Sequence, residues 1–344
     1  MVDIARLAGV HVSTVSRALA GSALVDPRQR ERILKLARQR NYAVNPAARN
    51  LRLRHTQTID VVIPVAPPSP HPLTDTFVLR LIGHLAEAIT ERGYSMSLQK
   101  FATTMRNGLA NLATTGRTDG IIVIGQSAGH ETLQRMAASF RPVVVWGAHV
   151  KGQTYCTVGT DNFGGALAAT EHLLKTGRGK IIFMGDPRPP AVRQRYEGYA
   201  HALARGPAGT GRARILHAPR IPDEAYQSMR DFLARSTHFD AVFAASDVGA
   251  ISAIHALRAA GVSIPQDVAV VGFDDIPIAA HTTPPLTTVR QDVVRAARTL
   301  VDLLLRRIAG EDTASVLIPA ELVVRESSSA SSTERSLGSR RSTA

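Results

Sequence analysis

Most of this chain alternates between short apolar runs and longer segments with apolar residues at helical spacing. The expected strands are 59–65, 95–98, 120–124, 142–146, 180–184, 214–217, 241–244 and 268–272. The expected helices are 77–92, 108–115, 130–139, 164–176, 195–204, 223–235 and 250–260. Such alternation is typical of parallel sheets covered by helices on both faces. Because it comes in two runs, it predicts two α/β layers, with a ligand cleft at the carboxyl ends of the strands.

The first 20 residues follow a different pattern, that of two short helices joined by a tight turn. Gly9 lies between them, where the end of a helix favours a residue that accepts a positive φ. The outward face of the second helix carries short polar side chains and a single arginine, Arg17. Such a face can approach the edges of DNA bases closely. The segment therefore indicates a helix-turn-helix, with an ordinary helical hairpin as the alternative.

A third helix follows directly. Asp26 is placed to cap it and Pro27 suits its first turn. Ile33, Leu36 and Ala37 recur at helical spacing and can cover the first two helices. Together the three helices predict a small all-α domain.

Charge is concentrated at the N-terminus. The chain has a formal net charge of +13, and residues 1–54 contain 11 Lys and Arg against 3 Asp and Glu. Such a concentration is expected for a polyanion partner such as DNA. A membrane surface fits less well, because these helices lack a broad apolar face with aromatic anchors.

Composition excludes several functional classes of protein. No run approaches the roughly 20 apolar residues that span a bilayer, and no secretory signal precedes the first helix. Cys156 is the single cysteine, which excludes an intrachain disulfide and fits a reducing cytoplasm. The 12 histidines lack metal-ligand spacing, and no catalytic motif is present. We therefore expect neither an enzyme nor a cofactor or metal.

Several motifs together resemble one family. They are Asp3-Ile-Ala-x-x-Ala-Gly-Val10, Thr14-Val-Ser-Arg17, Asn41-Tyr-x-x-Asn-Pro-x-Ala-Arg49, Val271-Gly-Phe-Asp-Asp275 and Pro284-Pro-Leu-Thr-Thr288. In these segments the chain resembles the LacI/GalR (lactose-repressor) family of transcriptional regulators, from residue 1 to about residue 325. It departs from the family at His11, where a serine is usual, and it lacks the Thr or Ser that usually caps the first helix, which leaves open a start a few residues upstream.

The resemblance implies the domain organisation. Residues 1–54 would form the helix-turn-helix domain, with a hinge helix at about 45–54. Residues 57–326 would form a periplasmic-binding-protein-like core of parallel sheets, which binds the effector and dimerises. Its N-subdomain would take about 58–158 and 289–317, and its C-subdomain about 159–288 and 318–326. We expect residues 327–344, which are basic and rich in serine, to be a disordered tail.

The resemblance also implies the DNA contacts. The residues concerned are Val12, Ser13, Thr14, Ser16, Arg17, Asn45, Ala48, Arg49 and Leu51. Val12 and Ser13 would discriminate bases, Arg17 would bind guanine, and the hydroxyl groups would contact phosphates. Leu51 would wedge into the minor groove, or would pack on its own domain instead.

At Arg195, Asp247 and Asp274 the resemblance also implies an effector site, and nearby polar and aromatic residues extend the prediction. The predicted site consists of Asp75, Phe77, Trp146, Arg195, Ser246, Asp247, Phe273 and Asp274. Carboxylates and arginines can bind vicinal hydroxyl groups, and aromatic rings can stack on a sugar. Any of these residues could instead be a cap or a core residue.

These features predict a homodimeric repressor that binds a near-palindromic operator and responds to a small sugar. The segments 145–148 and 153–161 resemble a subgroup associated with glucoside-type sugars. Corepression is the alternative polarity. A soluble sugar-binding protein without a DNA role is the alternative function, and a sugar-processing enzyme is a more distant one.

Overall fold

The computed structural model describes residues 1–19, 22–40, 42, 56–65, 73–102, 117–126, 129–207, 210, 212–235 and 238–329. The chain divides into two compact units, Met1–Thr56 and Gln57–Ala344. The predicted helix at 108–115 lies outside the described residues.

Within its described residues the N-terminal unit contains three helices, α1 (Val2–Ala8), α2 (Val12–Leu19) and α3 (Pro27–Gln39). Gly9 ends α1 in the left-handed conformation, with φ at 65°. The carboxylate of Asp26 accepts hydrogen bonds from the backbone N–H groups of Arg28 and Gln29, which caps α3. The helices bury a small apolar core that includes Val15 and Ile33. The predicted helix-turn-helix is therefore confirmed.

The larger unit contains two six-stranded sheets. The first has the order β11-β5-β4-β3-β1-β2 and is entirely parallel. Its strands are β1 (Thr58–Val65), β2 (Ser95–Ala102), β3 (Gly120–Ile124), β4 (Val143–Trp146), β5 (Cys156–Thr160) and β11 (Val316–Ile318). The second has the order β12-β10-β9-β8-β6-β7, in which only the β10–β12 pair is antiparallel. Its strands are β6 (Ile181–Met184), β7 (Ile215–Leu216), β8 (Ala241–Ala244), β9 (Ala269–Asp274), β10 (Thr287–Arg290) and β12 (Glu321–Val323).

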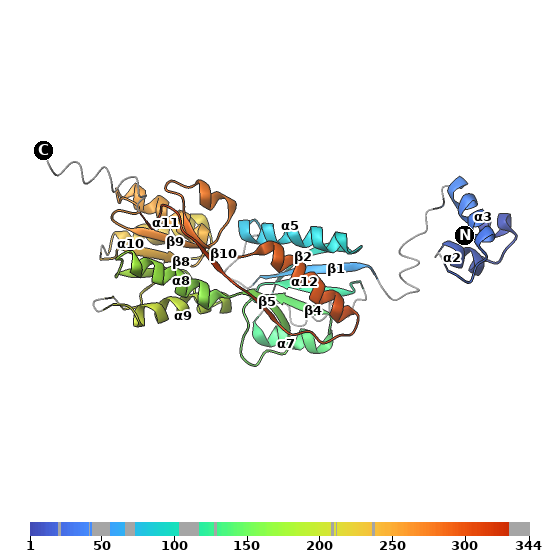
Figure 1. Ribbon diagram of the computed structural model, residues 1–344, viewed down its shortest axis with the longest axis horizontal. Coiled ribbons are helices and arrows are strands. Elements are labelled where there is room, and N and C mark those ends of the chain that lie inside the picture. Colours follow the sequence, from blue (N-terminus) through green and yellow to red (C-terminus); the bar gives the residue numbers. More distant parts are fainter. Residues whose placement is uncertain are drawn as a thin grey trace. The chain divides into compact units, whose positions relative to one another are not determined.

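Helices cover both faces of each sheet (Figure 1). The first sheet packs with α5 (Thr76–Glu91), α7 (His130–Ser139) and α12 (Val293–Ile308), and we call this assembly the N-subdomain. The second packs with α8 (Asn162–Lys175), α9 (Pro190–Ala204), α10 (Pro222–Leu233) and α11 (Asp247–Ala259), and we call it the C-subdomain. Burial on two faces explains the uninterrupted apolar runs of the central strands. The predicted two-layer parallel α/β fold is confirmed.

The helices differ from the prediction mainly in their ends. Helix α9 begins at Pro190, five residues before the predicted start, because proline suits the first turn of a helix. As a result, Arg195 lies inside the helix. The longest helices, α5 and α12, have 16 residues each, and no helix in the described part is long and apolar enough to cross a membrane.

The predicted disordered tail begins too early. Ser327 and Ser328 are buried in the C-subdomain. The N–H of Val270 donates to the carbonyl of Ser327. The hydroxyl of Ser327 donates to the carbonyl of Val270 and accepts from the N–H of Thr287. These bonds anchor the chain against β9 and β10, and local composition gives no sign of them. Residues 330–344 of the predicted tail lie outside the described residues.

This anchor yields a prediction about truncation. A chain that stops after Glu326 leaves the buried N–H groups of Val270 and Thr287 without acceptors, and each such loss costs about 1–3 kcal/mol. We expect a clear fall in the urea midpoint, whereas a chain that stops after Ser329 should unfold like the full chain. Equal midpoints for the two truncations would show that the serines do not hold the sheet.

Candidate functional site

Helix α2 presents the polar face that the sequence predicts. Ser13 and Arg17 are exposed, while Val12, Thr14 and Ser16 are half-buried. The opposite side of the helix packs into the core of the unit. The predicted base-contacting and phosphate-contacting side chains therefore lie on the outer side of one short helix.

His11 takes over the capping role that serine has in the family. Its Nδ1 atom lies 3.3 Å from the backbone N–H of Ser13 and 2.8 Å from the hydroxyl of Ser13. A ring nitrogen that accepts from the first turn of a helix acts as a serine hydroxyl would. The remaining DNA candidates, Asn45, Ala48, Arg49 and Leu51, lie outside the described residues.

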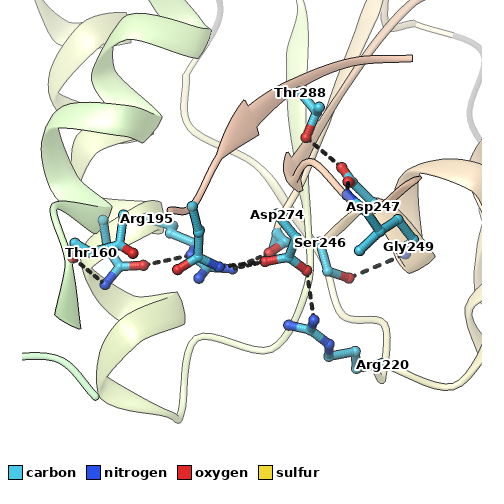
Figure 2. Close-up of polar contacts among 12 residues, drawn as sticks. Thr160, Arg195, Arg220, Ser246, Asp247, Gly249, Asp274 and Thr288 are labelled. Atoms are coloured by element: carbon cyan, nitrogen blue, oxygen red, sulfur yellow. Dashed lines mark hydrogen bonds and ion pairs between the residues drawn. The ribbon is translucent and has the colours of Figure 1, made fainter. Parts of the chain in front are cut away.

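A buried cluster of charged residues lies where the two subdomains meet, with Asp274 at its centre (Figure 2). Asp274 is the last residue of β9 and is fully buried. One carboxylate oxygen accepts from Nη2 of Arg220 at 2.6 Å. The other accepts from Nε2 of Gln291 at 2.6 Å and lies 3.8 Å from Nη1 of Arg195. Asp274 therefore faces two guanidinium groups and one amide.

Arg220 joins Asp274 to the other subdomain. It comes from the segment between β7 and α10, and its Nε atom donates to Asp75 at 2.7 Å. Asp75 caps α5 in the N-subdomain by accepting from the N–H of Val78. One arginine thus bridges two carboxylates that belong to different subdomains.

Arg195 lies deeper and is almost fully buried. Its Nε atom donates to the amide oxygen of Asn162 at 2.8 Å, and Nη1 donates to the carbonyl of Ala245 at 2.5 Å. The guanidinium carbon stacks 3.7 Å above the ring of Phe273. These contacts fix the plane of Arg195 and orient it toward Asp274.

Burial and opposite charges set the ionisation of the cluster. Burial lowers the pKa of Arg195 to about 10, against the attraction of Asp274. Burial also opposes the charge on Arg220, but Asp274 and Asp75 outweigh it, so that the pKa of Arg220 is raised. Burial raises the pKa of Asp274, and the charges of Arg220 and Arg195 oppose that shift. Arg220 and Arg195 thus favour the charged form of Asp274, which burial disfavours.

The backbone at this point is held in an unfavourable conformation. Asp274 and Asp275 have φ values of 127° and 52°. Residues with a side chain rarely adopt such angles, and the cost is about 1–3 kcal/mol each. Asp275 is held by Arg290 and Arg325 at 2.7 Å each. Strain of this kind is often stored at functional sites.

Three further residues of the predicted effector site also have partners within the protein. The carboxylate of Asp247 accepts from the hydroxyl of Thr288 and the N–H of Ile276, so it points away from Arg220 (Figure 2). The hydroxyl of Ser246 accepts from the N–H of Gly249 and caps α11. Phe273 is fully buried beneath Arg195. Ser246 thus caps a helix and Phe273 lies in the core, and the role of all three residues in effector binding stays a prediction.

Two predicted aromatic residues form a pair at the same end of the N-subdomain. The rings of Phe77 and Trp146 are 6.0 Å apart, and both are largely buried. The guanidinium carbon of Arg220 lies 5.7 Å from the ring centre of Phe77. The aromatic pair thus borders the charged cluster.

Sequence reasoning missed Arg220, Asn162 and Gln291. Asn162 follows β5 and Gln291 follows β10, so the rule that parallel sheets bind ligands at the carboxyl ends of their strands could have found them. Arg220 lies on a connecting segment, and only the folded chain brings it to its partners.

A cavity of about 510 Å³ lies beside the segments that pass between the subdomains, and Gln291 lines it as well as contacting Asp274. Its lining includes Arg80, Asp275, Arg290 and Glu321. Arg290 pairs with both acids, and Arg80 donates to the carbonyl of Asp275. The charges of this lining are paired with one another, as those of the Asp274 cluster are, but only the Asp274 cluster includes residues that the sequence predicts for the effector site, and it is therefore the candidate for ligand binding.

The helix-turn-helix and the larger unit each match a known protein family. The family model "Bacterial regulatory proteins, lacI family" matches residues 1–45, and a periplasmic binding protein-like domain matches residues 170–328. The transcriptional regulator CelR of Thermobifida fusca is 33% identical over 334 residues, which cover 94% of this chain and 96% of CelR.

Solved structures agree with this match. A complex of the transcriptional regulator CelR with cellobiose has a TM-score of 0.68 and 30% identity, and the match covers 94% of this chain and 98% of that one. The lac repressor dimer bound to operator and the anti-inducer ONPF has a TM-score of 0.82 at 22% identity, over 95% and 98% of the two chains, which supports the fold. The chain therefore belongs to the lacI family of bacterial regulatory proteins and is a DNA-binding transcriptional regulator.

Proposed function

We propose that this regulator is a cytoplasmic, homodimeric repressor whose operator affinity is controlled by a neutral sugar. The bridge from Asp75 through Arg220 to Asp274 carries the proposal, because carboxylates and a guanidinium group between the two subdomains are groups that can bind sugar hydroxyls. In such a core, a ligand that binds both halves can change the orientation of one half relative to the other. That change can in turn alter the positions of the two DNA-binding domains in a dimer.

The outer face of α2 supports the DNA half of the proposal. Arg17 is an exposed bidentate donor that matches guanine, and Ser13 beside it can donate or accept. Thr14 and Ser16 would contact phosphates, which position the helix. The solved lac repressor is a dimer on its operator. A two-fold dimer of this chain would read a near-palindromic site.

The charge balance supports a neutral ligand. Asp75 and Asp274 carry two negative charges, and Arg195 and Arg220 carry two positive ones. An anionic ligand would add an uncompensated charge to a buried site, which is costly. Sugar hydroxyl groups can both donate to the carboxylates and accept from the arginines. The CelR complex contains cellobiose, which is a neutral glucoside.

Other functions receive less support. The match of residues 1–45 to the lacI family, together with the folded helix-turn-helix, speaks against a sugar-binding protein without a DNA role. The curated relatives are transcriptional regulators, and we infer that the chain has neither a catalytic role nor a resident cofactor. Corepression remains the alternative polarity, since the same site can favour either DNA-bound or DNA-free states.

A gel shift tests this proposal. The purified protein is mixed with the DNA upstream of its own gene at physiological salt with excess non-specific competitor, and a panel of neutral sugars that includes cellobiose is added. We expect a competitor-resistant band that one sugar removes. A band that a sugar strengthens would reverse the polarity, and the absence of a specific band on any nearby promoter would contradict operator binding there.

The same assay tests Arg17. Arg17→Ala should weaken specific binding by about 10–100-fold, because a bidentate contact with a base contributes about 1–3 kcal/mol of discrimination. Arg38→Ala is the matched control, since it removes an equal charge from an exposed position on α3. It should lower binding to operator and random DNA alike. If Arg17→Ala also lowers both equally, Arg17 contacts phosphate only.

A further inference from the structure

We propose that Arg220 is an internal latch, which holds the two subdomains together in the absence of effector and which the effector must displace. Arg220 contacts Asp75 through Nε and Nη2, and the same Nη2 atom contacts Asp274. The first carboxylate belongs to the N-subdomain and the second to the C-subdomain. The side chain therefore connects the two halves in the way that a bound ligand would.

The contacts of Arg220 compete with those that a ligand needs. One oxygen of Asp274 is already engaged by Gln291 and the other by Arg220. One oxygen of Asp75 caps α5 and the other accepts from Arg220. With Arg220 in place Asp274 is fully buried and Asp75 is nearly so, and a hydroxyl group can therefore reach the outer oxygen of either acid only if the Arg220 guanidinium moves. Ligand entry and release of the latch are therefore linked.

Arg220 is better suited to this role than the neighbouring contacts. Gln194 on α9 donates to the carbonyl of His149 in the N-subdomain, and Arg80 on α5 donates to the carbonyl of Asp275. Both of these bonds have an uncharged acceptor, whereas Arg220 has a carboxylate on each side. The bond of Arg80 is charge-assisted on the donor side only, whereas Arg220 forms an ion pair with an acid in each subdomain.

The chain contains its own reporter for the latch. Trp146 is the single tryptophan, and its ring packs on Phe77, which the guanidinium group of Arg220 faces. Trp146 is 8% exposed with the latch in place. If the latch opens and the subdomains separate, quenchers in solution gain access to this end of the N-subdomain.

The test compares acrylamide quenching of Trp146 in the full-length protein without sugar or DNA. Arg220→Gln should raise the quenching constant at least about two-fold, because the closed state loses its charged bridge. Asp75→Asn should do the same, and it keeps the cap of α5 because asparagine also caps helices. Arg220→Lys should restore part of the protection. Circular dichroism checks that each variant is folded.

Arg188→Gln is the matched control. Arg188 is exposed in the C-subdomain, and its ion pair with Asp186 stays within that subdomain. It should quench like the wild type. Unchanged quenching in both Arg220→Gln and Asp75→Asn would overturn the latch, as would an equal rise in Arg188→Gln.

The role of the effector in this proposal rests on the proposed function, but the quenching test does not. A sugar that shifts the operator band should bind to Arg220→Gln at least as tightly as to the wild type if it must displace the latch, because the variant has no bridge to open. Latch variants that quench more in a protein that binds no sugar would contradict the proposed effector and keep the latch. A normal sugar response together with unchanged quenching in the variants would contradict the latch and keep the proposed effector.

Discussion

Asp274→Ala should abolish the response to sugar and leave operator binding in place. Asp274 supplies the only carboxylate in the described cluster that both Arg195 and Arg220 face. Without it, the sugar loses charge-assisted hydrogen bonds that contribute about 1.5–3 kcal/mol each, so its affinity should fall by about 100-fold or more. A titration of Trp146 fluorescence with the sugar that shifts the operator band measures the loss.

The same substitution should also destabilise the core. Arg195 is buried and would lose the negative charge that faces it, and removal of one partner from a buried ion pair costs about 3–5 kcal/mol. The helix-turn-helix has its own apolar core, so the operator band should persist below the melting temperature of the larger unit.

Two further variants separate binding from folding. Asp274→Asn keeps the shape of the side chain and should lose the sugar response with a smaller loss of stability. Asp186→Asn alters a carboxylate that pairs only locally with Arg188, and it should respond to sugar normally. A normal sugar response in a folded Asp274→Asn protein would remove Asp274 from the effector site.

The sequence predicted the elements whose local signals are strong. Asp26 and Pro27 are typical of a helix start and predict that of α3. The buried runs of β1 and β3 contain no polar residue except Asp60. Strand β5 was missed because its segment, Cys-Thr-Val-Gly-Thr, has few apolar side chains. Helix α12 is absent from the sequence-based prediction, although its local signals are clear. Asp292 caps it, and its apolar residues recur at helical spacing.

The candidate site was predictable only in part. Asp274 could be found because it follows a strand, and Asp75 because it follows the first strand and precedes an apolar helix. Arg220 has no local signal, since its partners are 145 and 54 residues away in the chain. The resemblance pointed to Asp247 and Phe273, but their roles depend on burial, which a sequence does not state. Contacts between distant segments therefore decide which of the charged residues face a ligand.

The stability of the larger unit should fall as the pH rises from 5 to 8, through the buried carboxyl of Asp247. Burial raises the pKa of Asp247 to about 7 from the ordinary 3.8, and the negative charge of Asp274 adds to the shift. Hydrogen bonds from Thr288 and Ile276 oppose it.

The direction of this change in stability follows from which state of the chain, folded or unfolded, releases the proton of Asp247 first. Below pH 3.8 the carboxyl is protonated in both the folded and the unfolded chain, and its contribution to stability is complete. Between the two pKa values only the unfolded chain releases the proton, so stability is lost until the pH passes about 7. At about 1.4 kcal/mol per pKa unit, the loss between pH 5 and pH 8 is roughly 2 to 3 kcal/mol.

Comparison with Asp247→Asn isolates this contribution from that of other acids. The difference in free energy of unfolding between wild type and Asp247→Asn, measured by urea denaturation, should shift by that amount against the wild type between pH 5 and pH 8. A constant difference over this range would mean that Asp247 is already ionised at pH 5 in the folded protein.

Thr288→Val provides the second arm of this test. The hydroxyl of Thr288 lies 2.5 Å from Asp247 and lowers its pKa, and valine keeps the shape of the side chain without the donor. The variant should therefore hold its proton to a higher pH, and the pH-dependent loss of stability should extend above pH 8. An unchanged upper limit would show that burial and Asp274, rather than this hydrogen bond, set the ionisation of Asp247.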